Sequence, residues 1–328
     1  MPLVPPIEVA MILSSASCRS CPGPGSVPYS VWKEIHKATP ALIPGIMSVC
    51  LQFDFHPSCL KYSNGFILPK SGKADYTTPH SFRVIILLDS FSKILEKAVQ
   101  FDLSAMAHLR GLVSVHQAGF LTGVSAEDAA TRLIHETNVT HRSGLCATTG
   151  FFDIKGGFDN VSHSILLDRL TSLGTTPYLF SWSEPFCSGP TAVAPGHFLS
   201  NRPITLVYLG APNLSAPVSV GVPQGSPVFP LFIVIFVAPL HAPDGISFRL
   251  SYVHGFSLTI ASTSYEQNSR KLIAAFNSLT TLGRPIRIPF APEKTEVIHW
   301  KTYRQRSPAP FSPIQLGGQS TTPSTSAC

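Results

Sequence analysis

The stretch at residues 220–260 constrains the fold of this chain more than any other part of its sequence. It opens with Val-Gly-Val-Pro-Gln-Gly-Ser-Pro at 220–227, continues as an apolar run to residue 240, and ends in two β-rich segments that meet at His254 and Gly255. Glycines let a backbone approach another group closely, and β-branched and aromatic residues around a polar–Gly pair are typical of a β-hairpin. This order predicts a glycine-rich loop, then a buried helix, then a short hairpin.

The composition favours a folded domain with a sizeable core. Of the 328 residues, 44% are hydrophobic and 13% are charged, which argues against global disorder. The formal net charge of +6 permits an anionic partner such as a nucleic acid. The charge is spread thinly and there is no long run of Lys or Arg, so basicity alone leaves the kind of partner open.

Cysteine usage and hydropathy bear on where the protein works. The seven cysteines are odd in number and irregular in spacing, which argues against a disulfide framework, and Cys18 and Cys21 have no second pair at zinc-ligand spacing. The N-terminus lacks a basic segment ahead of an apolar core, and the longest apolar run, at 228–240, is shorter than the about 20 residues that span a bilayer. We expect an intracellular protein, in the cytoplasm or nucleus, that is neither secreted nor membrane-bound.

A carboxylate stands at the end of a predicted apolar strand. The segment Phe-Phe-Asp-Ile-Lys-Gly-Gly at 151–157 places Asp153 there, and the two glycines leave open space beside it. This arrangement suits a metal ion that holds a phosphoryl group. A cap on the next helix is the alternative role for Asp153. Asp159 is better suited to cap a helix than to ligate a metal.

Three basic residues lie on or between two further predicted strands. Lys70 and Lys73 follow a strand at 66–68, and Arg83 lies in a strand at 82–88. Cations placed in this way can contact phosphate groups, which positions a nucleic acid without reading its sequence. The alternative is that all three are ordinary solvated surface cations.

Two helices and a tail are also predicted. Ser125, with Asp128 three residues later, has the spacing of a capping box ahead of a helix at 126–139. Apolar periodicity predicts another helix at 264–282. Residues 303–328 are rich in Pro, Ser, Thr, Gly and Gln, a composition typical of a disordered tail.

Taken in chain order, these segments resemble the reverse transcriptases of non-LTR (LINE-like) retrotransposons, over roughly residues 20–300. The resemblance implies an α+β fold with fingers and palm, in which an antiparallel palm sheet packs on helices and the thumb is largely absent. It divides the chain into an N-terminal extension with a helix at 1–60, a fingers-like region at 61–150, a palm-like region at 151–302 with motifs A to D, and the tail at 303–328.

The resemblance also implies roles for single residues. Asp153 falls in motif A as the catalytic metal ligand, and Lys294 falls in motif D, where a lysine aids protonation of the leaving pyrophosphate. The expected cofactor is Mg²⁺, and the expected partners are an RNA template, a DNA primer and deoxynucleoside triphosphates. The residues expected to bind substrate are Lys70, Lys73, Arg83, Pro223, Gln224 and Gly225.

The hairpin tip departs from the pattern of this family. Motif C reads Tyr/Phe-x-Asp-Asp in the family, whereas here it reads Tyr252-Val-His254-Gly255. Imidazole suits Zn, Cu, Fe or Ni better than Mg²⁺, and glycine has no side-chain ligand. We therefore expect a degenerate metal site and a copy that is catalytically inactive or nearly so. A non-catalytic nucleic-acid-binding module and an unselected relic protein remain open as alternatives.

Overall fold

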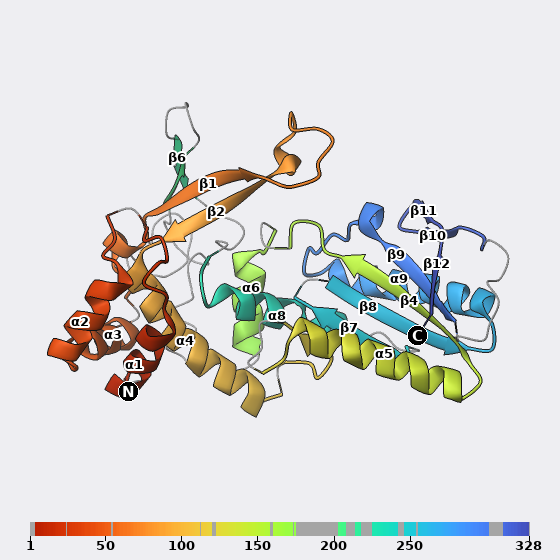
Figure 1. Ribbon diagram of the computed structural model, residues 1–328, viewed down its shortest axis with the longest axis horizontal. Helices are drawn as coiled ribbons and strands as arrows, with labels where there is room; N and C mark the ends of the chain where they lie inside the picture. Colours follow the sequence, from red (N-terminus) through yellow and green to blue (C-terminus); the bar gives the residue numbers. More distant parts are fainter. Residues whose placement is uncertain are drawn as a thin grey trace. The chain divides into compact units, whose positions relative to one another are not determined.

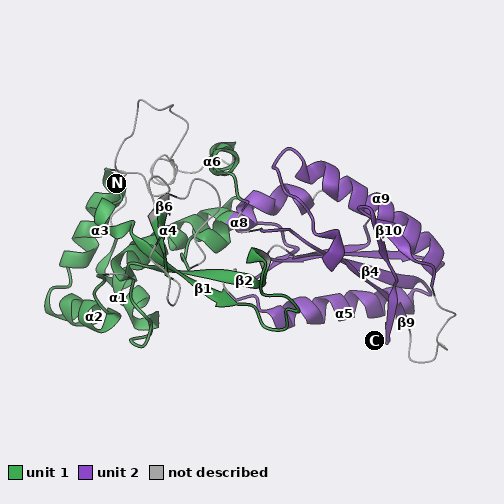
Figure 2. Cartoon of the chain, turned by 90° about the horizontal axis from the view of Figure 1, so that it is seen from above, with its two compact units in different colours: residues 1–110, 161–232 green, residues 111–160, 233–328 purple. Residues whose placement is uncertain are grey.

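The computed structural model places the described residues in two compact units, which interleave along the chain (Figure 2). One unit comprises residues 1–110 and 161–232, and the other comprises residues 111–160 and 233–328. Both combine helices with a sheet, in agreement with the α+β class predicted from the sequence. The structure describes residues 4–23, 25–53, 55–111, 113–119, 123–157, 160–172, 174, 203–207, 214–217, 225–241, 246–253, 255–301 and 311–327.

In the first unit, α4 is the longest described helix. Asp89 caps it by accepting hydrogen bonds from the backbone N–H groups of Phe91 and Ser92, and its buried face includes Ile94 and Leu103. The helix expected within residues 1–60 is divided, and the chain turns at Thr39–Ala41 between two of the helices there. The helices of this unit are α1 (Pro6–Ser15), α2 (Tyr29–Ala38), α3 (Leu42–Gln52), α4 (Ser90–Leu109) and α6 (His163–Ser172), with short 3-10 turns at Ser58–Leu60 and Pro79–Ser81.

The sheet of the first unit has the order β2-β1-β5-β6. Figure 1 labels β1, β2 and β6 of this sheet. Strands β1 and β2 form an antiparallel hairpin in which Leu68 lies opposite Arg83. Strand β5 runs parallel to β1, and β6 is antiparallel to β5. The strands are β1 (Ser63–Pro69), β2 (Phe82–Leu88), β5 (Pro203–Val207) and β6 (Leu214–Pro217).

The apolar run after the glycine-rich loop forms a buried helix, as the sequence predicts. It consists of α8 (Phe229–Val237) and a 3-10 turn at Ala238–His241. Every residue of α8 except Pro230 is at most 3% exposed, so no face of the helix is left to solvent along most of its length. No helix within the described part of the chain is long and apolar enough to cross a membrane.

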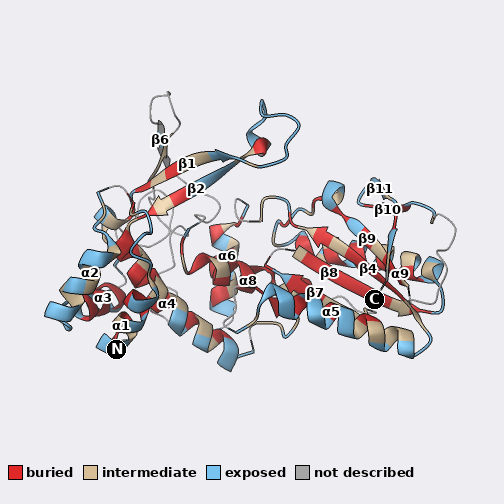
Figure 3. Ribbon diagram, in the orientation of Figure 1, coloured by how far each residue is buried: buried red, intermediate tan, exposed pale blue. Residues whose placement is uncertain are grey.

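The second unit is built on a sheet of order β12-β9-β4-β8-β7-β3, in which β4 is central and antiparallel to both neighbours. The predicted hairpin is present as β7 and β8, which are antiparallel. The strands are β3 (Gln117–Ala118), β4 (Cys146–Asp153), β7 (Phe248–Tyr252), β8 (Gly255–Ser262), β9 (Glu296–Lys301) and β12 (Ser324–Ala327). Figure 3 shows β4 and β8 as largely buried.

Two helices, α5 (Ala126–Arg142) and α9 (Tyr265–Gly283), cover this sheet. The side chains of β4 alternate between them. On one face Ala147 and Phe151 pack with Leu133 of α5. On the other, the rings of Phe152 and Phe276 of α9 lie 4.9 Å apart between centroids, and Asn268 Nδ2 donates to Thr148 Oγ1 at 3.2 Å.

Both helices begin at side-chain caps. The capping box predicted at Ser125 and Asp128 is confirmed, with the Asp128 backbone N–H donating to Ser125 Oγ at 3.1 Å. Ser264 caps α9 by accepting from the Gln267 backbone N–H at 3.2 Å. Residues 117–142, which the resemblance assigned to the fingers, belong to this unit, since β3 pairs with β7 and α5 contacts β4 and β7.

The disordered tail predicted at 303–328 is wrong for residues 311–327. They form β10 (Ile314–Leu316), β11 (Gln319–Thr321) and β12, and β12 runs parallel to β9 in the sheet. Ile314 and Leu316 are buried, which offsets the unfavourable composition around them.

Candidate functional site

Asp153 lies at the last position of β4, as the sequence predicts. Its backbone carbonyl accepts a hydrogen bond from the Ala291 N–H at 2.9 Å, and the N–H of Lys155 donates to the Pro289 carbonyl at 2.9 Å. Ile154 and Phe290 form an isolated β-bridge between these two bonds. These backbone hydrogen bonds hold residues 289–291, just before Lys294, alongside the end of β4 that carries Asp153.

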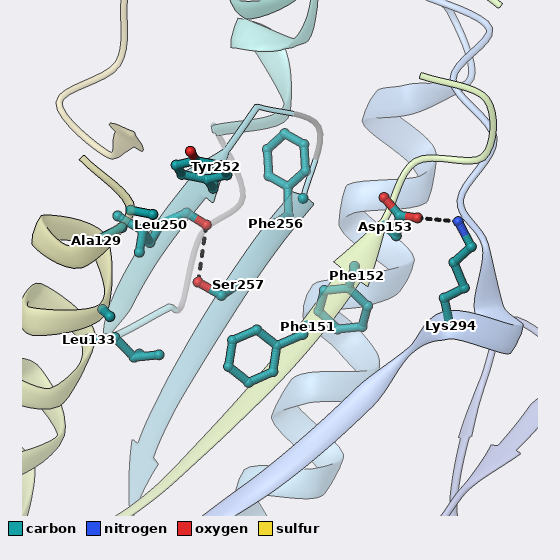
Figure 4. Close-up of a pocket in the computed structure, with 13 residues that line it drawn as sticks. Ala129, Leu133, Phe151, Phe152, Asp153, Leu250, Tyr252, Phe256, Ser257 and Lys294 are labelled. Carbon is teal, nitrogen blue, oxygen red and sulfur yellow. Dashed lines mark hydrogen bonds and ion pairs between the residues drawn. The ribbon is translucent and has the colours of Figure 1, made fainter. Parts of the chain in front are cut away.

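Lys294 pairs directly with Asp153. It ends the 3-10 turn Pro292–Lys294, and its Nζ donates to Asp153 Oδ2 at 2.6 Å (Figure 4). The side chain of Lys294 is 58% exposed and that of Asp153 is 27% exposed, so the pair lies at the surface rather than in the core. The sequence selects both residues for separate roles, and the structure brings them together as an ion pair.

The strand position opposite Asp153 is Gly255, which begins β8. A Cβ added at Gly255 would lie 3.5 Å from the Tyr252 carbonyl oxygen, an ordinary contact distance, so the backbone there has room for a side chain. Val253, at the hairpin turn, has a φ of 60°, which is a strained conformation for a β-branched residue. His254, the other degenerate position, lies outside the described residues.

These residues do not fit a magnesium site. Mg²⁺ needs near-octahedral oxygen ligands, usually from one or two carboxylates as well as waters and phosphates. Asp153 is the carboxylate at this strand end, its Oδ2 is paired with Lys294, and Gly255 offers no ligand. Across the described ranges, no three His, Cys, Asp or Glu side chains are grouped so that they could hold a metal ion.

The segment before α5 supports the hairpin, a role that the sequence analysis missed. Ser251 Oγ donates to Gln117 Oε1, and Gln117 Nε2 donates to the Ala118 carbonyl at 2.9 Å. Ser251 Oγ also lies 3.0 Å from His241 Nε2, and burial lowers the pKa of His241 to about 4, which keeps its imidazole neutral at pH 7. Gln117 is 2% exposed, so its polar side chain must be hydrogen-bonded in the fold.

Gly119, in the same segment, is required by its backbone. Its φ is +88°, and an added Cβ would lie 3.1 Å from the ring of Tyr252 and from a methyl group of Val253. The hairpin turn therefore packs on a position that only glycine fills without strain.

A cavity of about 380 Å³ opens beside the ion pair, within the second unit. In Figure 4 the ion pair lies at one side of it and α5 at the other. Apart from the ion pair, its walls are mostly apolar and come from α5 and from three strands of the sheet. The lining residues are Ala126, Ala129, Ala130, Leu133, Phe151, Phe152, Asp153, Leu250, Tyr252, Gly255, Phe256, Ser257 and Lys294.

The three predicted phosphate contacts belong to the first unit and lie on the β1–β2 hairpin. The backbone N–H of Lys70 donates to the Ser81 carbonyl at 2.8 Å, which closes the hairpin around the segment containing Lys73. Lys73 and Arg83 are exposed, whereas Lys70 is half-buried. Two of the three cations are thus open to a large anionic partner.

The described end of the glycine-rich loop is anchored in the first unit. At Gly225, with a φ of +135°, an added Cβ would lie 2.5 Å from the Ile86 carbonyl oxygen, so no larger residue fits without a shift. Ser226 Oγ donates to Glu96 Oε2, and Ser92 Oγ donates to Glu96 Oε1 at 2.8 Å in a fully buried setting. Pro223 and Gln224, which are also predicted to bind substrate, lie outside the described residues.

A comparison with known protein families agrees with these observations. Residues 68–312 match the family described as reverse transcriptase (RNA-dependent DNA polymerase), which is more than half of the chain. The matched region includes both strands of the β7–β8 hairpin, as well as Asp153, Gly255 and Lys294.

Three similar proteins come from Drosophila melanogaster. The chain is 24% identical over 246 residues to the probable RNA-directed DNA polymerase from transposon X-element, covering 74% of this chain and 26% of that protein. It is 23% identical over 318 residues to the probable RNA-directed DNA polymerase from transposon BS, covering 95% and 33%. It is 28% identical over 227 residues to the putative 115 kDa protein in the type-1 retrotransposable element R1DM, covering 68% and 20%. The chain thus spans a fifth to a third of the length of these relatives.

Proposed function

Because this chain belongs to the reverse transcriptase family, and its similar proteins identify it as such a domain of a LINE-like retrotransposon, we propose that it keeps the nucleic-acid-binding architecture of the family without its catalysis. In this proposal the β1–β2 hairpin belongs to the fingers-like region expected at 61–150. The sheet around β4 belongs to the palm-like region expected at 151–302, which then begins before residue 151, because β4 starts at Cys146. The reaction of the family is template-directed transfer of a nucleotide to a DNA primer.

The observation that carries the loss of catalysis is the pairing of Asp153 with Lys294 opposite Gly255. Reverse transcriptases generally use divalent metal ions, and two-metal nucleotidyl transfer needs the ions about 3.5–4 Å apart on a clamp of carboxylates. Asp153 already neutralises an ammonium, and Gly255 opposite it supplies no second carboxylate, so these described residues do not form such a clamp. Lys294 acts here as the counter-ion of Asp153, which makes it a poor source of a proton for the leaving pyrophosphate.

The remaining residues support nucleic-acid binding. Lys73 and Arg83 are exposed on one hairpin, where they and Lys70 would contact phosphate oxygens of an RNA template or DNA primer. Gly225, at the described end of the glycine-rich loop, lies against the Ile86 carbonyl of β2, and we expect Pro223 and Gln224 to contact the same partner or an incoming nucleotide. Mg²⁺ could still accompany a bound triphosphate as its counter-ion, without protein ligands of its own.

Binding is tested by titrating an RNA–DNA primer–template into the protein at several salt concentrations. We expect the double variant Lys73→Gln/Arg83→Gln to weaken binding and to reduce the salt slope by about 2, since each phosphate contact contributes nearly one counterion. Lys37→Gln is the matched control, because Lys37 is an exposed cation paired with Glu34 on a different element. Unchanged binding in the double variant would contradict the proposed role of the β1–β2 hairpin in nucleic-acid binding.

A further inference from the structure

The cavity beside Asp153 is not explained by nucleotidyl transfer. Most of its wall is apolar, whereas a polymerase substrate consists largely of phosphate and sugar. Its volume of about 380 Å³ falls in the range of about 300–1,000 Å³ that is typical of sites for small molecules. All of its lining residues belong to the second unit.

The shape of the cavity follows from the sequence of α5. Ala126, Ala129, Ala130 and Leu133 are spaced so that they share one face of the helix, and all four line the cavity. The three alanines leave empty the space that larger side chains would fill, and Leu133 is buried against Ala147 and Trp300.

Aromatic rings and the Asp153–Lys294 ion pair define what could occupy this space. Phe151 and Phe256 line it from two strands, and Tyr252, 46% exposed, lines it where the cavity meets solvent (Figure 4). Flat apolar groups pack well against such rings. Lys294 Nζ has three N–H groups and uses one of them on Asp153, so it can also hold an anionic group that reaches the mouth of the cavity.

We propose that this cavity is a binding site for a small aromatic molecule with a single anionic group. The ring system lies under α5 against Phe151 and Leu250, and the anion accepts a hydrogen bond from Lys294. This inference is independent of the proposed binding of nucleic acid, whose contacts lie on the other unit.

The test uses two fluorescent probes of similar size, the anionic 8-anilino-1-naphthalenesulfonate and the neutral N-phenyl-1-naphthylamine. We expect both to bind with one saturable site per chain, and the anionic probe to bind more tightly. Ala130→Phe fills the cavity and should abolish both signals. Thr131→Phe, the matched control, places the same ring on the next, exposed residue of α5, which does not line the cavity, and should bind both probes as the native protein does.

Lys294→Gln separates the two parts of the proposal. It should weaken the anionic probe about tenfold, the loss expected for one charge-assisted hydrogen bond of about 1.4 kcal/mol, and leave the neutral probe unchanged. This arm also decides the outcome if Ala130→Phe fails to fold, as judged by circular dichroism. Equal binding of both probes to native protein and Lys294→Gln would overturn the anionic preference. Undiminished binding to folded Ala130→Phe would overturn the site itself.

Discussion

The two faces of strand β4 differ in how completely they are packed. On the α9 face, a Cβ added at Gly150 would lie 2.7 Å from the Phe152 ring and 3.0 Å from Leu272, so no space is left. On the α5 face, the same strand borders a cavity of about 380 Å³ and ends at the Asp153–Lys294 pair. The α9 face is fully packed at Gly150, whereas the α5 face borders the candidate site. In the proposed function, the packed face keeps the family's architecture, whereas the strand end at Asp153 lies opposite Gly255 and lacks a matching carboxylate there.

Adding carbon atoms to each face of β4 should give the largest difference in stability between the two faces. Gly150→Ala should destabilise the protein by about 1–3 kcal/mol, since overpacking forces neighbouring side chains to shift. Ala130→Val adds two carbons to the open face and should change stability by less than about 1 kcal/mol, the combined effect of helix propensity and partial filling of the cavity. Urea denaturation of both variants measures the difference. Equal destabilisation would mean that the α5 face is as tightly packed as the α9 face.

The α9 face should also carry a pH dependence. His299 is buried there, its Nδ1 lies 2.7 Å from Thr148 Oγ1, and burial lowers its pKa to about 4. The unfolded chain therefore binds a proton more readily than the folded one between about pH 6.5 and pH 4. The contribution of His299 to the free energy of unfolding is complete above pH 6.5 and is lost as the pH falls towards 4.

Substitution of His299 isolates that contribution. Native protein should lose on the order of 2 kcal/mol of stability through this residue between pH 7 and pH 4, and His299→Gln should flatten that part of the profile. His135, on the exposed side of α5, is the matched control. Parallel profiles for native protein and His299→Gln would show that His299 is not held neutral by the fold.

The sequence could predict elements whose signals are local. The helix after Ser125, the strand at 82–88 and the hairpin at 248–260 follow from capping, alternation and turn residues within a few positions, and the structure confirms them. The tail could not be predicted in this way, because β12 is stabilised by pairing with β9, more than 20 residues earlier. The amino-acid composition of residues 311–327 does not indicate that they pair with β9.

The candidate site was predictable in its parts but not in its assembly. Asp153 and Lys294 both stand out in the sequence, yet they are 141 positions apart, and nothing local shows that one neutralises the other. The role of Gln117 was hidden for the same reason, since its partner Ser251 is 134 positions away. Contacts between distant segments depend on which strands pair and in what register, and no local feature of either segment shows which strand it will pair with.

The smallest effect should come from breaking the ion pair. Lys294→Met should change the free energy of unfolding by no more than about 1 kcal/mol, because surface ion pairs contribute little against solvent and side-chain entropy. The measurement is the urea midpoint at low and at high salt. A larger loss that persists at high salt would show that Lys294 stabilises the fold rather than only neutralising Asp153.

We propose that the scaffold of a polymerase remains in this chain while its metal site is lost. The most direct measurement is primer extension on poly(rA)/oligo(dT) with Mg²⁺ and separately with Mn²⁺, using native protein beside the double variant His254→Asp/Gly255→Asp. The room at Gly255, directly opposite Asp153, makes a carboxylate at this position sterically feasible. We expect no extension by the native protein and measurable extension by the variant. Primer extension by the native protein would contradict the proposed loss of the metal site. No extension by either protein would show that the loss of activity extends beyond the β7–β8 hairpin.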